Sequence, residues 1–372
     1  KSQFWYRSTK AVMRRAIPVG GAIVALLVVL GTPFLHIKFG NPDDRVLPTT
    51  ASAHQVGDQL RDDFASNFNA GMSMVIPEAT GTTPAELDRY AAELSRVPEV
   101  ALVSAPDGTF VGGNRVGPAS APAGIADGSA FLSVRSTAPL FSDASKLQLS
   151  RLHEVPGPGG RTVLIAGGAQ VSHDIVSAVT SRMPLVLTLI GVITFVLLFG
   201  LTGSLVLPLK ALVLNVLSLS AAFGALVWVF QEGHLGALGT TPTGTLEANI
   251  PVLMFCVAFG LSMDYEVFLL SRIREYWLES GRTRADSDEA VALGLARTGR
   301  VVTAAAMIMA IAFAALIAAQ VSFMRIFGVG LTLAVLVDAT LVRMGLLPAF
   351  MRVMGRWNWW APAPLVRLHA RF

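Results

Sequence analysis

The sequence predicts a polytopic α-helical membrane protein with six transmembrane helices: one helix, then a large polar insert, then five helices. The composition favours this class, because 53% of the 372 residues are hydrophobic and 15% are charged, whereas a typical soluble domain carries about 25% charged residues. Six apolar runs are each long enough to cross a hydrocarbon core of about 30 Å. The polar insert is long enough to form an α+β domain of its own.

The first predicted span covers residues 16–36 and follows a short basic segment, 1–15. The region 184–348 contains a predicted bundle of five further spans, near residues 184–204, 208–230, 250–271, 301–320 and 326–348. A polar tail, 349–372, follows the last of them. The chain therefore divides into a one-plus-five set of spans and an insert, 37–183.

The distribution of basic residues predicts the orientation of these spans. Lys and Arg gather before the first span, in the loop 272–300 and after the last span, whereas the loop 231–249 contains none. Because basic loops tend to remain in the cytoplasm, we expect both termini in the cytoplasm and the insert outside. Within 272–300, the stretch Ser287–Arg297 has apolar side chains on one side; it is either an amphipathic helix on the inner leaflet or a plain connection.

The insert reads as an external α+β domain. Thr83 is expected to cap a helix that Pro84 begins, with Glu86 as its third residue. The order of elements is β-α-β-β-α-β, the ferredoxin-like pattern, with 111–128 expected as a loop. The predicted strands are Met72–Ile76, Val100–Ser104, Ala130–Arg135 and Arg161–Ala166, and the predicted helices are Thr83–Arg96 and Ser142–Glu154.

Two further helices are predicted at the ends of the insert. An amphipathic helix covers Ala53–Phe68, before the first strand of the domain. A second helix, 170–183, is expected to run directly into the second span. This continuity predicts a mechanical coupling between the external domain and the membrane helices.

A charged tripeptide, Asp264-Tyr265-Glu266, interrupts the apolar run 250–271. Asp264 lies about 21 Å into that helix at 1.5 Å per residue, near or just past the middle of the membrane. A carboxylate there costs about 2.5–3.5 kcal/mol, which chains retain where the group faces a polar pathway. We therefore predict a proton or ion relay of Asp264 and Tyr265; the alternative is a structural Asp hydrogen-bonded to a neighbouring helix.

Other residues near this tripeptide are expected to support it. Glu266 is rotated by about 100° from Tyr265 on a helix, and the small residues Gly260 and Ser262 would let a partner helix approach closely. Asp338 lies in the last span and is expected to bridge to another helix, either as a structural residue or beside the relay. Its face differs by about 140° from that of Arg343 on an α-helix, so we expect no simple pair between them.

Several functional classes are disfavoured by the motifs. The single cysteine, Cys256, cannot form an intrachain disulfide or a cysteine metal site. The sequence has no HExxH, no Walker A motif and no zinc spacing, and GLSMD (260–264) lacks the second glycine of a nucleophile elbow. We therefore expect no enzyme and no cofactor, with energy drawn from an ion gradient rather than from ATP.

The stretch GLSMDYEVFLLSRIREYW (260–277) resembles the signature of the MmpL family (mycobacterial membrane protein, large), in the resistance–nodulation–division (RND) superfamily of proton-driven exporters. The one-plus-five pattern around an external ferredoxin-like domain resembles the C-terminal half of a full-length member. Three further stretches agree: TGRVVTAAAMIMAIAF (298–313), VLVDATLVRMGLLPAF (335–350) and MGRWNWWAPAP (354–364).

The resemblance implies a secondary transporter in a bacterial plasma (inner) membrane that exports lipids or other amphiphiles towards the cell envelope. Asp264 and Tyr265 match one of the two Asp-Tyr pairs of the family's proton relay. The second pair would come from another transporter half, in the same native chain or in a separate subunit. A small membrane-anchored accessory protein is a further expected partner, and nucleic acid is not. Two alternatives remain: export of drugs or siderophores by the same mechanism, and a non-transporting scaffold subunit.

Overall fold

The computed structural model describes residues 3–63 and 71–369 of the chain. The chain divides into two compact units. The helical unit consists of Lys1–Phe39 and Arg182–Phe372, and the sheet unit consists of Gly40–Ser181. This division matches the predicted separation of membrane spans from a polar insert.

Six helices among the described residues are long and apolar enough to cross a membrane, one before the sheet unit and five after it. The predicted one-plus-five class is thus confirmed. Including short continuations, the candidate spans are Ala16–His36, Gly168–Thr202, Val206–Gln231, Asn249–Leu278, Arg284–Ala318 and Ser322–Trp359. Their main helical segments are α2 (Ala16–Gly31), α6 (Gly168–Thr202), α7 (Val206–Leu226), α8 (Asn249–Leu278), α9 (Arg284–Ala315) and α10 (Ser322–Val337).

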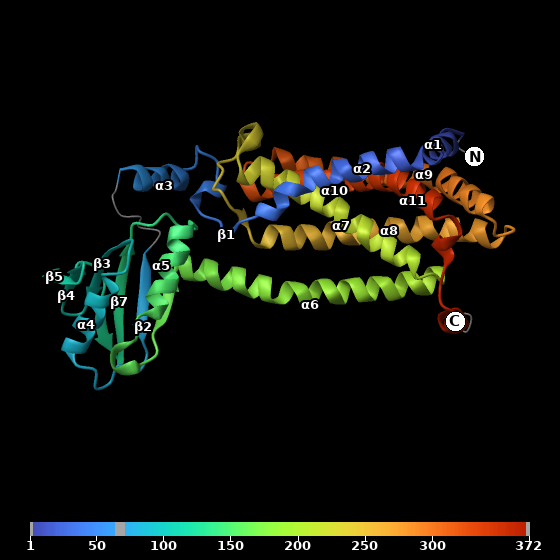
Figure 1. Cartoon of the computed structure of the whole chain (residues 1–372). Coiled ribbons are helices and arrows are strands. Elements are labelled where there is room, and N and C mark those ends of the chain that lie inside the picture. Colours follow the sequence, from blue (N-terminus) through green and yellow to red (C-terminus); the bar gives the residue numbers. More distant parts are fainter. Residues whose placement is uncertain (1–2, 64–70, 370–372) are drawn as a thin grey trace. The chain divides into compact units, whose positions relative to one another are not determined.

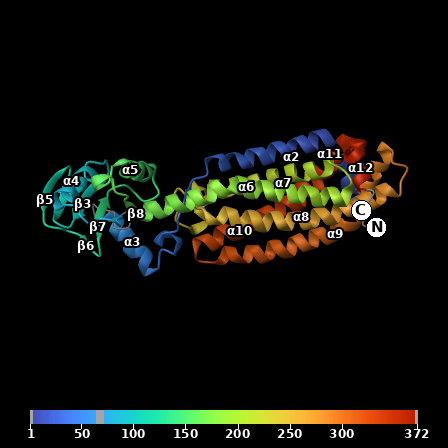
Figure 2. The same cartoon turned by 90° about the horizontal axis from the view of Figure 1, so that it is seen from below.

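Helix α10 contacts α7, α8 and α9 within the set of long helices that Figures 1 and 2 show. Helix α2 packs along α7 and along α11 (Leu347–Met354). The approach of α2 to α7 is close at Gly224, where a Cβ would lie 2.0 Å from the Leu30 carbonyl oxygen. Ser262 and Glu266 on α8, and Asp338 just after α10, are buried within this set of helices.

The helices continue further than the sequence indicates around the predicted loop 272–300. Helix α8 extends to Leu278, and α9 begins at Arg284, with Thr283 as its cap. Ser287–Arg297 forms the first turns of α9 and is neither a separate interfacial helix nor a plain connection. Its Val291 and Leu295 side chains are fully buried in a protein core, and α1 (Gln3–Arg14) packs against α9. The apolar side is thus covered by protein.

The sheet unit has the predicted split β-α-β arrangement. Four strands form its centre in the order β3-β7-β2-β8, with every neighbouring pair antiparallel. Two helices complete the pattern, α4 after β2 and α5 after β7. Their bounds are β2 (Met72–Ile76), α4 (Pro84–Leu94), β3 (Val100–Ala105), β7 (Ser129–Ser136), α5 (Asp143–Glu154) and β8 (Leu164–Gly167).

The stretch 111–128, predicted as a loop, contains short strands. β4 (Gly108–Val111) pairs with β5 (Asn114–Gly117) across a Gly112-Gly113 turn in which both residues have positive φ. This turn is typical of a two-residue hairpin. β6 (Gly124–Ala126) pairs with β7. The residues of β5 and β6 are exposed or half-buried and show no alternating apolar pattern, so these two strands are difficult to predict from the sequence, whereas Phe110 of β4 is buried in the core.

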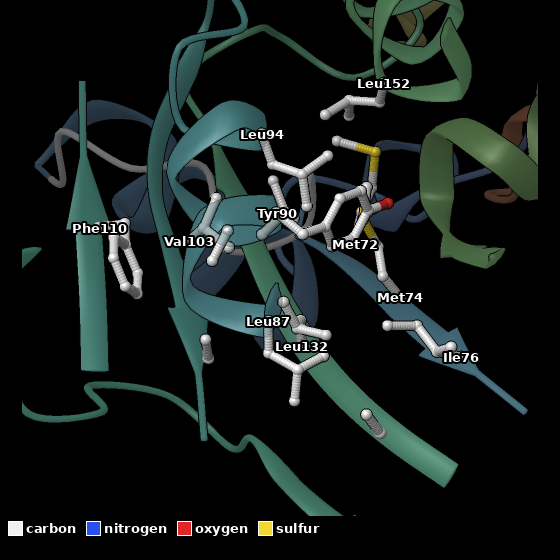
Figure 3. Close-up of a cluster of buried hydrophobic side chains, with 14 of the residues drawn as sticks. Met72, Met74, Ile76, Leu87, Tyr90, Leu94, Val103, Phe110, Leu132 and Leu152 are labelled. Atoms are coloured by element: carbon white, nitrogen blue, oxygen red, sulfur yellow. The ribbon is translucent and has the colours of Figure 1, made fainter. Parts of the chain in front are cut away.

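The core of the sheet unit lies between one face of the sheet and the two helices (Figure 3). Alternate residues of β2, Met72, Met74 and Ile76, point into it and are at most 2% exposed. Helix α4 begins as predicted: the Glu86 backbone N–H donates to the Thr83 side chain, whose own backbone N–H donates to the Glu86 carboxylate at 2.8 Å. This capping box fixes the start of the helix that covers the sheet.

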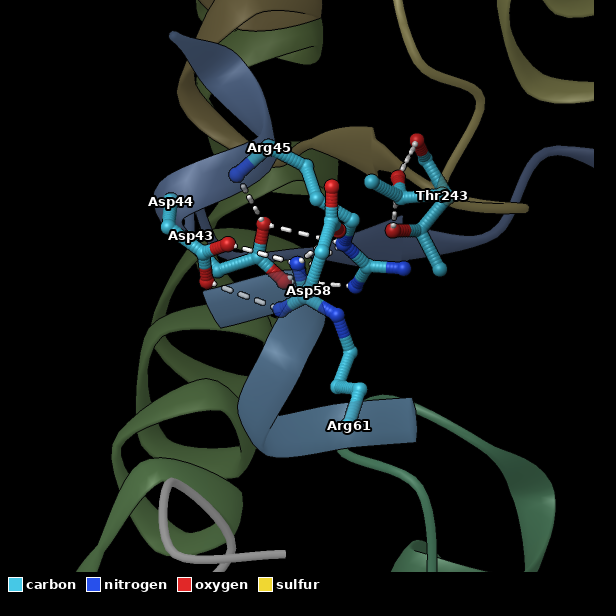
Figure 4. Close-up of polar contacts among 7 residues, drawn as sticks. Asp43, Asp44, Arg45, Asp58, Arg61 and Thr243 are labelled. Atoms are coloured by element: carbon cyan, nitrogen blue, oxygen red, sulfur yellow. Dashed lines mark hydrogen bonds and ion pairs between the residues drawn. The ribbon is translucent and has the colours of Figure 1, made fainter. Parts of the chain in front are cut away.

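An ion-pair cluster anchors α3 (Ser52–Asp62) to the turn before it (Figure 4). The Arg61 guanidinium donates to both Asp44 carboxylate oxygens, at 2.9 and 2.6 Å, and to Asp58 at 2.7 Å. The hydrogen bonds from Arg61 hold the pKa of the Asp44 carboxyl below its ordinary value. The predicted helix 53–68 is therefore present over its first part, and its last five residues lie outside the described residues.

Helix α6 is unbroken from Gly168 to Thr202 and includes the predicted helix 170–183. Pro184 lies within it. The predicted helical continuity between insert and second span is confirmed, and the mechanical coupling remains a prediction.

Candidate functional site

The charged tripeptide lies on α8, and its three side chains point to different sides of the helix because successive residues rotate by about 100°. Asp264 is exposed on the surface of the helical unit. Tyr265 is half-buried, and Glu266 is buried at 7% exposure. The structure therefore separates the two predicted relay residues from Glu266, which faces the interior of this unit.

Asp338 and Arg343 form a buried ion pair, which corrects the expectation that they would not pair. The Arg343 Nε and Nη2 atoms both lie 2.8 Å from Asp338 Oδ2. The reason is local: Asp338–Leu346 is a π-helix, in which hydrogen bonds join residues five apart. Residues five apart then share a face, whereas an α-helix would set them about 140° apart.

Arg343 also joins this pair to α8. Its Nη2 atom donates to the Ser262 carbonyl oxygen and, at 3.0 Å, to Ser262 Oγ. Its guanidinium lies 5.4 Å from the centroid of the Tyr265 ring, within the range of a cation–π contact. The expected bridge from Asp338 to another helix thus exists, with Arg343 as its intermediate.

A small pocket lies beside this cluster, and Ser262, Tyr265 and Asp338 contribute to its wall. Its volume of about 10 Å³ is that of roughly one water molecule. The remaining wall is apolar, and the Tyr265 hydroxyl points to Met309 Sδ at 3.3 Å. The phenol is therefore positioned by the protein at the edge of a small, mostly apolar space that Ser262 and Asp338 also border.

Asp264 and Gly260 lie on a different face, in an exposed stripe along α8. The stripe contains residues spaced 3, 4, 4 and 3 apart: Leu253, Cys256, Gly260, Asp264 and Val267. This spacing is that of a helix face that packs against another helix. A Cβ added at Gly260 would meet nothing within 4 Å, so this glycine leaves space on the outer side of the unit.

Sequence reasoning missed one buried basic residue of this region, Lys210. Lys210 on α7 is 7% exposed and interacts electrostatically with Glu266. It lies close to the start of its span, where a basic residue resembles part of a polar connection. The signal that could have found it is a basic residue flanked by at least three apolar residues within an apolar run, as in VLPLKALVL (206–214).

These buried and half-buried groups can hold and move protons, because they combine carboxylates, a phenol and a lysine with a guanidinium that stays charged. They are Glu266, Asp338, Tyr265, Lys210 and Arg343. Among the residues that the structure describes, no group of three or more His, Cys, Asp or Glu side chains is arranged to hold a metal ion. The chemistry available here is proton transfer and ion pairing.

Comparison with known proteins places the chain in a family. The model of the MMPL family matches residues 142–369. A membrane protein of Streptomyces coelicolor is 35% identical over 100% of this chain and 49% of its own length. The trehalose monomycolate exporter MmpL3 of Mycobacterium tuberculosis is 32% identical over 99% of this chain and 38% of its own length. The mycolic acid-containing lipids exporter MmpL11 of Mycolicibacterium smegmatis is 34% identical over 97% of this chain and 37% of its own length.

The chain thus spans half or less of the length of these curated relatives. The family match covers more than half of the chain and includes all five helices that follow the sheet unit. Together with the six candidate spans, this match shows that the chain belongs to the MMPL family of multi-pass membrane transporters.

Proposed function

We propose that this chain is one half of a proton-driven exporter and that Asp264 and Tyr265 carry the proton. The observation that supports the proposal most strongly is the exposed stripe on α8. Asp264 is the single acidic or basic residue among the five residues of that stripe. An unpartnered carboxylate facing lipid near the membrane centre would cost about 2.5–3.5 kcal/mol. A second transporter half that covers the stripe removes this cost and supplies polar partners.

The length of the relatives supports the same arrangement. Each of the three relatives described above is about twice as long as the matched region or longer. Their remaining length has room for another half of this size. Under this proposal Gly260 permits the close approach of the partner helix, and Asp264 then lies between the two halves.

Arg343 would act as the positioning residue of the relay. It is held by Asp338 and by Ser262, and it lies against the Tyr265 ring. Protonation of Asp264 from the outside and release to the cytoplasm would alternately remove and restore a charge between the halves. Such a change of charge in a medium of low dielectric is large enough to shift helix packing.

Lipids or other amphiphiles are the cargo class that the relatives favour, because two of the relatives described above are named as exporters of mycolic lipids. The sheet unit would lie outside the membrane and form the conduit with its counterpart. The basic residues before α2 and in the stretch 272–300 support this orientation. Small-molecule efflux and a scaffold role are alternative outcomes of the test below.

The test is the Asp264→Asn variant of the native transporter, assayed for proton-driven export of a labelled lipid. Asn keeps the size of the side chain and removes the titratable proton, so export should fall to the background of the empty membrane. Glu279→Gln is the matched control, because Glu279 is an exposed carboxylate at the end of the same helix; it should export as the native protein does.

Normal membrane levels of both variants, measured by immunoblot, keep the comparison fair. Unchanged export by Asp264→Asn would refute the relay. If the native protein exports no lipid and Asp264→Asn nevertheless loses the native proton flux, a small-molecule cargo is favoured. If Asp264→Asn has a normal phenotype and deletion of this chain removes a bound partner protein from the membrane, the scaffold role is favoured.

A further inference from the structure

The pair Lys210 and Glu266 is not explained by the relay between halves. Both residues are 7% exposed, on neighbouring helices α7 and α8, and they carry opposite formal charges. Within the described part of the chain, Lys210 Nζ and Glu266 Oε1 are buried without a hydrogen-bond partner. No direct ion pair within 4.0 Å joins the two side chains, although they interact electrostatically.

This open arrangement differs from that of the structural ion pair beside it. Asp338 and Arg343 are in direct contact at 2.8 Å, which offsets the cost of burying both charges. Each buried polar atom without a hydrogen-bond partner costs about 1–3 kcal/mol or more of folding free energy. Two opposite charges that are buried without direct contact therefore contribute little to the stability of the fold. Proteins place such groups where they must gain and lose protons.

The charged groups that face Glu266 are Lys210, Arg343 and Asp338. Arg343 keeps its proton at any ordinary pH, and it is already bound to Asp338. Lys210 is the neighbour that can exchange a proton with the Glu266 carboxylate, because a buried lysine titrates readily.

Along the helix axis both residues lie towards one end of the bundle from Asp264, although Asp264 and Glu266 point to different sides of α8. Glu266 is two residues beyond Asp264 along α8, and Lys210 is four residues from the start of α7, about 6 Å along its axis. The start of α7 lies near the end of α8: the Leu205 N–H donates to the Trp360 carbonyl, and the adjacent Trp359 ring stacks on Trp277 at 5.1 Å. This is the end that the basic residues assign to the cytoplasm.

We propose that Glu266 and Lys210 form an exit site, which carries each proton from the relay between the halves to the cytoplasmic end of α7. A proton released by Asp264 binds the Glu266 carboxylate and makes it a neutral acid. The Lys210 ammonium releases its own proton to the cytoplasmic side, and Glu266 then transfers the proton that it received from Asp264 to the neutral Lys210 amine. One proton enters and one leaves, and both groups regain their initial states. This inference rests on the proposed function.

The experiment compares Glu266→Gln, Lys210→Met and the double variant in the native transporter reconstituted into liposomes. Proton uptake under an imposed pH gradient is measured with an enclosed pH dye, and thermal stability is measured on the same preparations. Each single variant leaves one buried charge without its counter-charge and should lower stability. The double variant removes both charges and should regain stability, since neutral replacements of buried pairs are well tolerated.

Proton uptake separates transfer from structure. We expect uptake to fall at least tenfold in Glu266→Gln and to stay low in the double variant, while Glu279→Gln keeps native uptake. Infrared difference spectra of the native protein should also show a carboxylic acid band that Glu266→Gln removes. Native uptake by the stable double variant, or an unchanged band, would overturn the exit site.

The failure of the exit site is distinguishable from the failure of the relay. Native uptake in the double variant together with loss of uptake in Asp264→Asn leaves the relay in place and rejects only the exit site. Absence of proton uptake in the native protein rejects both.

Discussion

Replacing Arg343 by Met should be among the most destabilising single substitutions in the helical unit. The side chain is 4% exposed, and it donates to Asp338, to the Ser262 carbonyl and to Ser262 Oγ. Met fills similar volume but supplies no donor, so the Asp338 carboxylate, whose side chain is 11% exposed, loses its counter-charge. Breaking a buried pair in this way costs about 3–5 kcal/mol.

The assay is the unfolding free energy of the purified protein, measured by titration of a denaturing detergent into mixed micelles. Asp338→Asn in the Arg343→Met background should recover most of the loss, because it removes the orphaned charge. Arg272→Met is the matched control, since its pair with Glu275 is 39% and 50% exposed and should cost less than about 1 kcal/mol. A native-like value for Arg343→Met, or no recovery in the double variant, would refute the reasoning.

Three further predictions concern other parts of the chain. Because Arg61 lowers the Asp44 pKa, this pair stabilises the sheet unit at pH values above the ordinary Asp pKa of about 3.9, and the stabilisation is lost as the pH falls through the lower pKa of the folded state. In an acid titration followed by circular dichroism, Arg61→Met should lack this loss of stability. An acid profile identical to that of the native protein would contradict the prediction. Thr83→Ala should destabilise α4 by about 1 kcal/mol, measured by thermal unfolding or by faster amide exchange in its first turn. Gly260→Leu should leave the expression and thermal stability of this half unchanged, yet lower export at least tenfold because the larger side chain blocks the partner helix. Export at the native level by Gly260→Leu would show that no helix packs closely against the stripe.

Much of the fold could be predicted from the sequence because its signals are local. Apolar runs give the six spans, since any long apolar helix satisfies its backbone hydrogen bonds internally and can cross a membrane. The start of α4 is similarly local, because Thr83 and Glu86 cap each other within one turn. The edge strand β5 was missed because its residues are all partly or fully exposed and leave no apolar alternation to detect.

The candidate site is divided in the same way. The sequence by itself determined that a carboxylate and a phenol, Asp264 and Tyr265, lie near the middle of an apolar helix, because that statement needs only helix rise and membrane thickness. Which way each side chain faces depends on the packing of α7, α8 and α10, so only the tertiary structure placed Asp264 on the outer stripe and Glu266 opposite Lys210. The pairing of Asp338 with Arg343 was likewise decided by tertiary structure, because a local change to π-helical geometry realigns residues that an α-helix would separate.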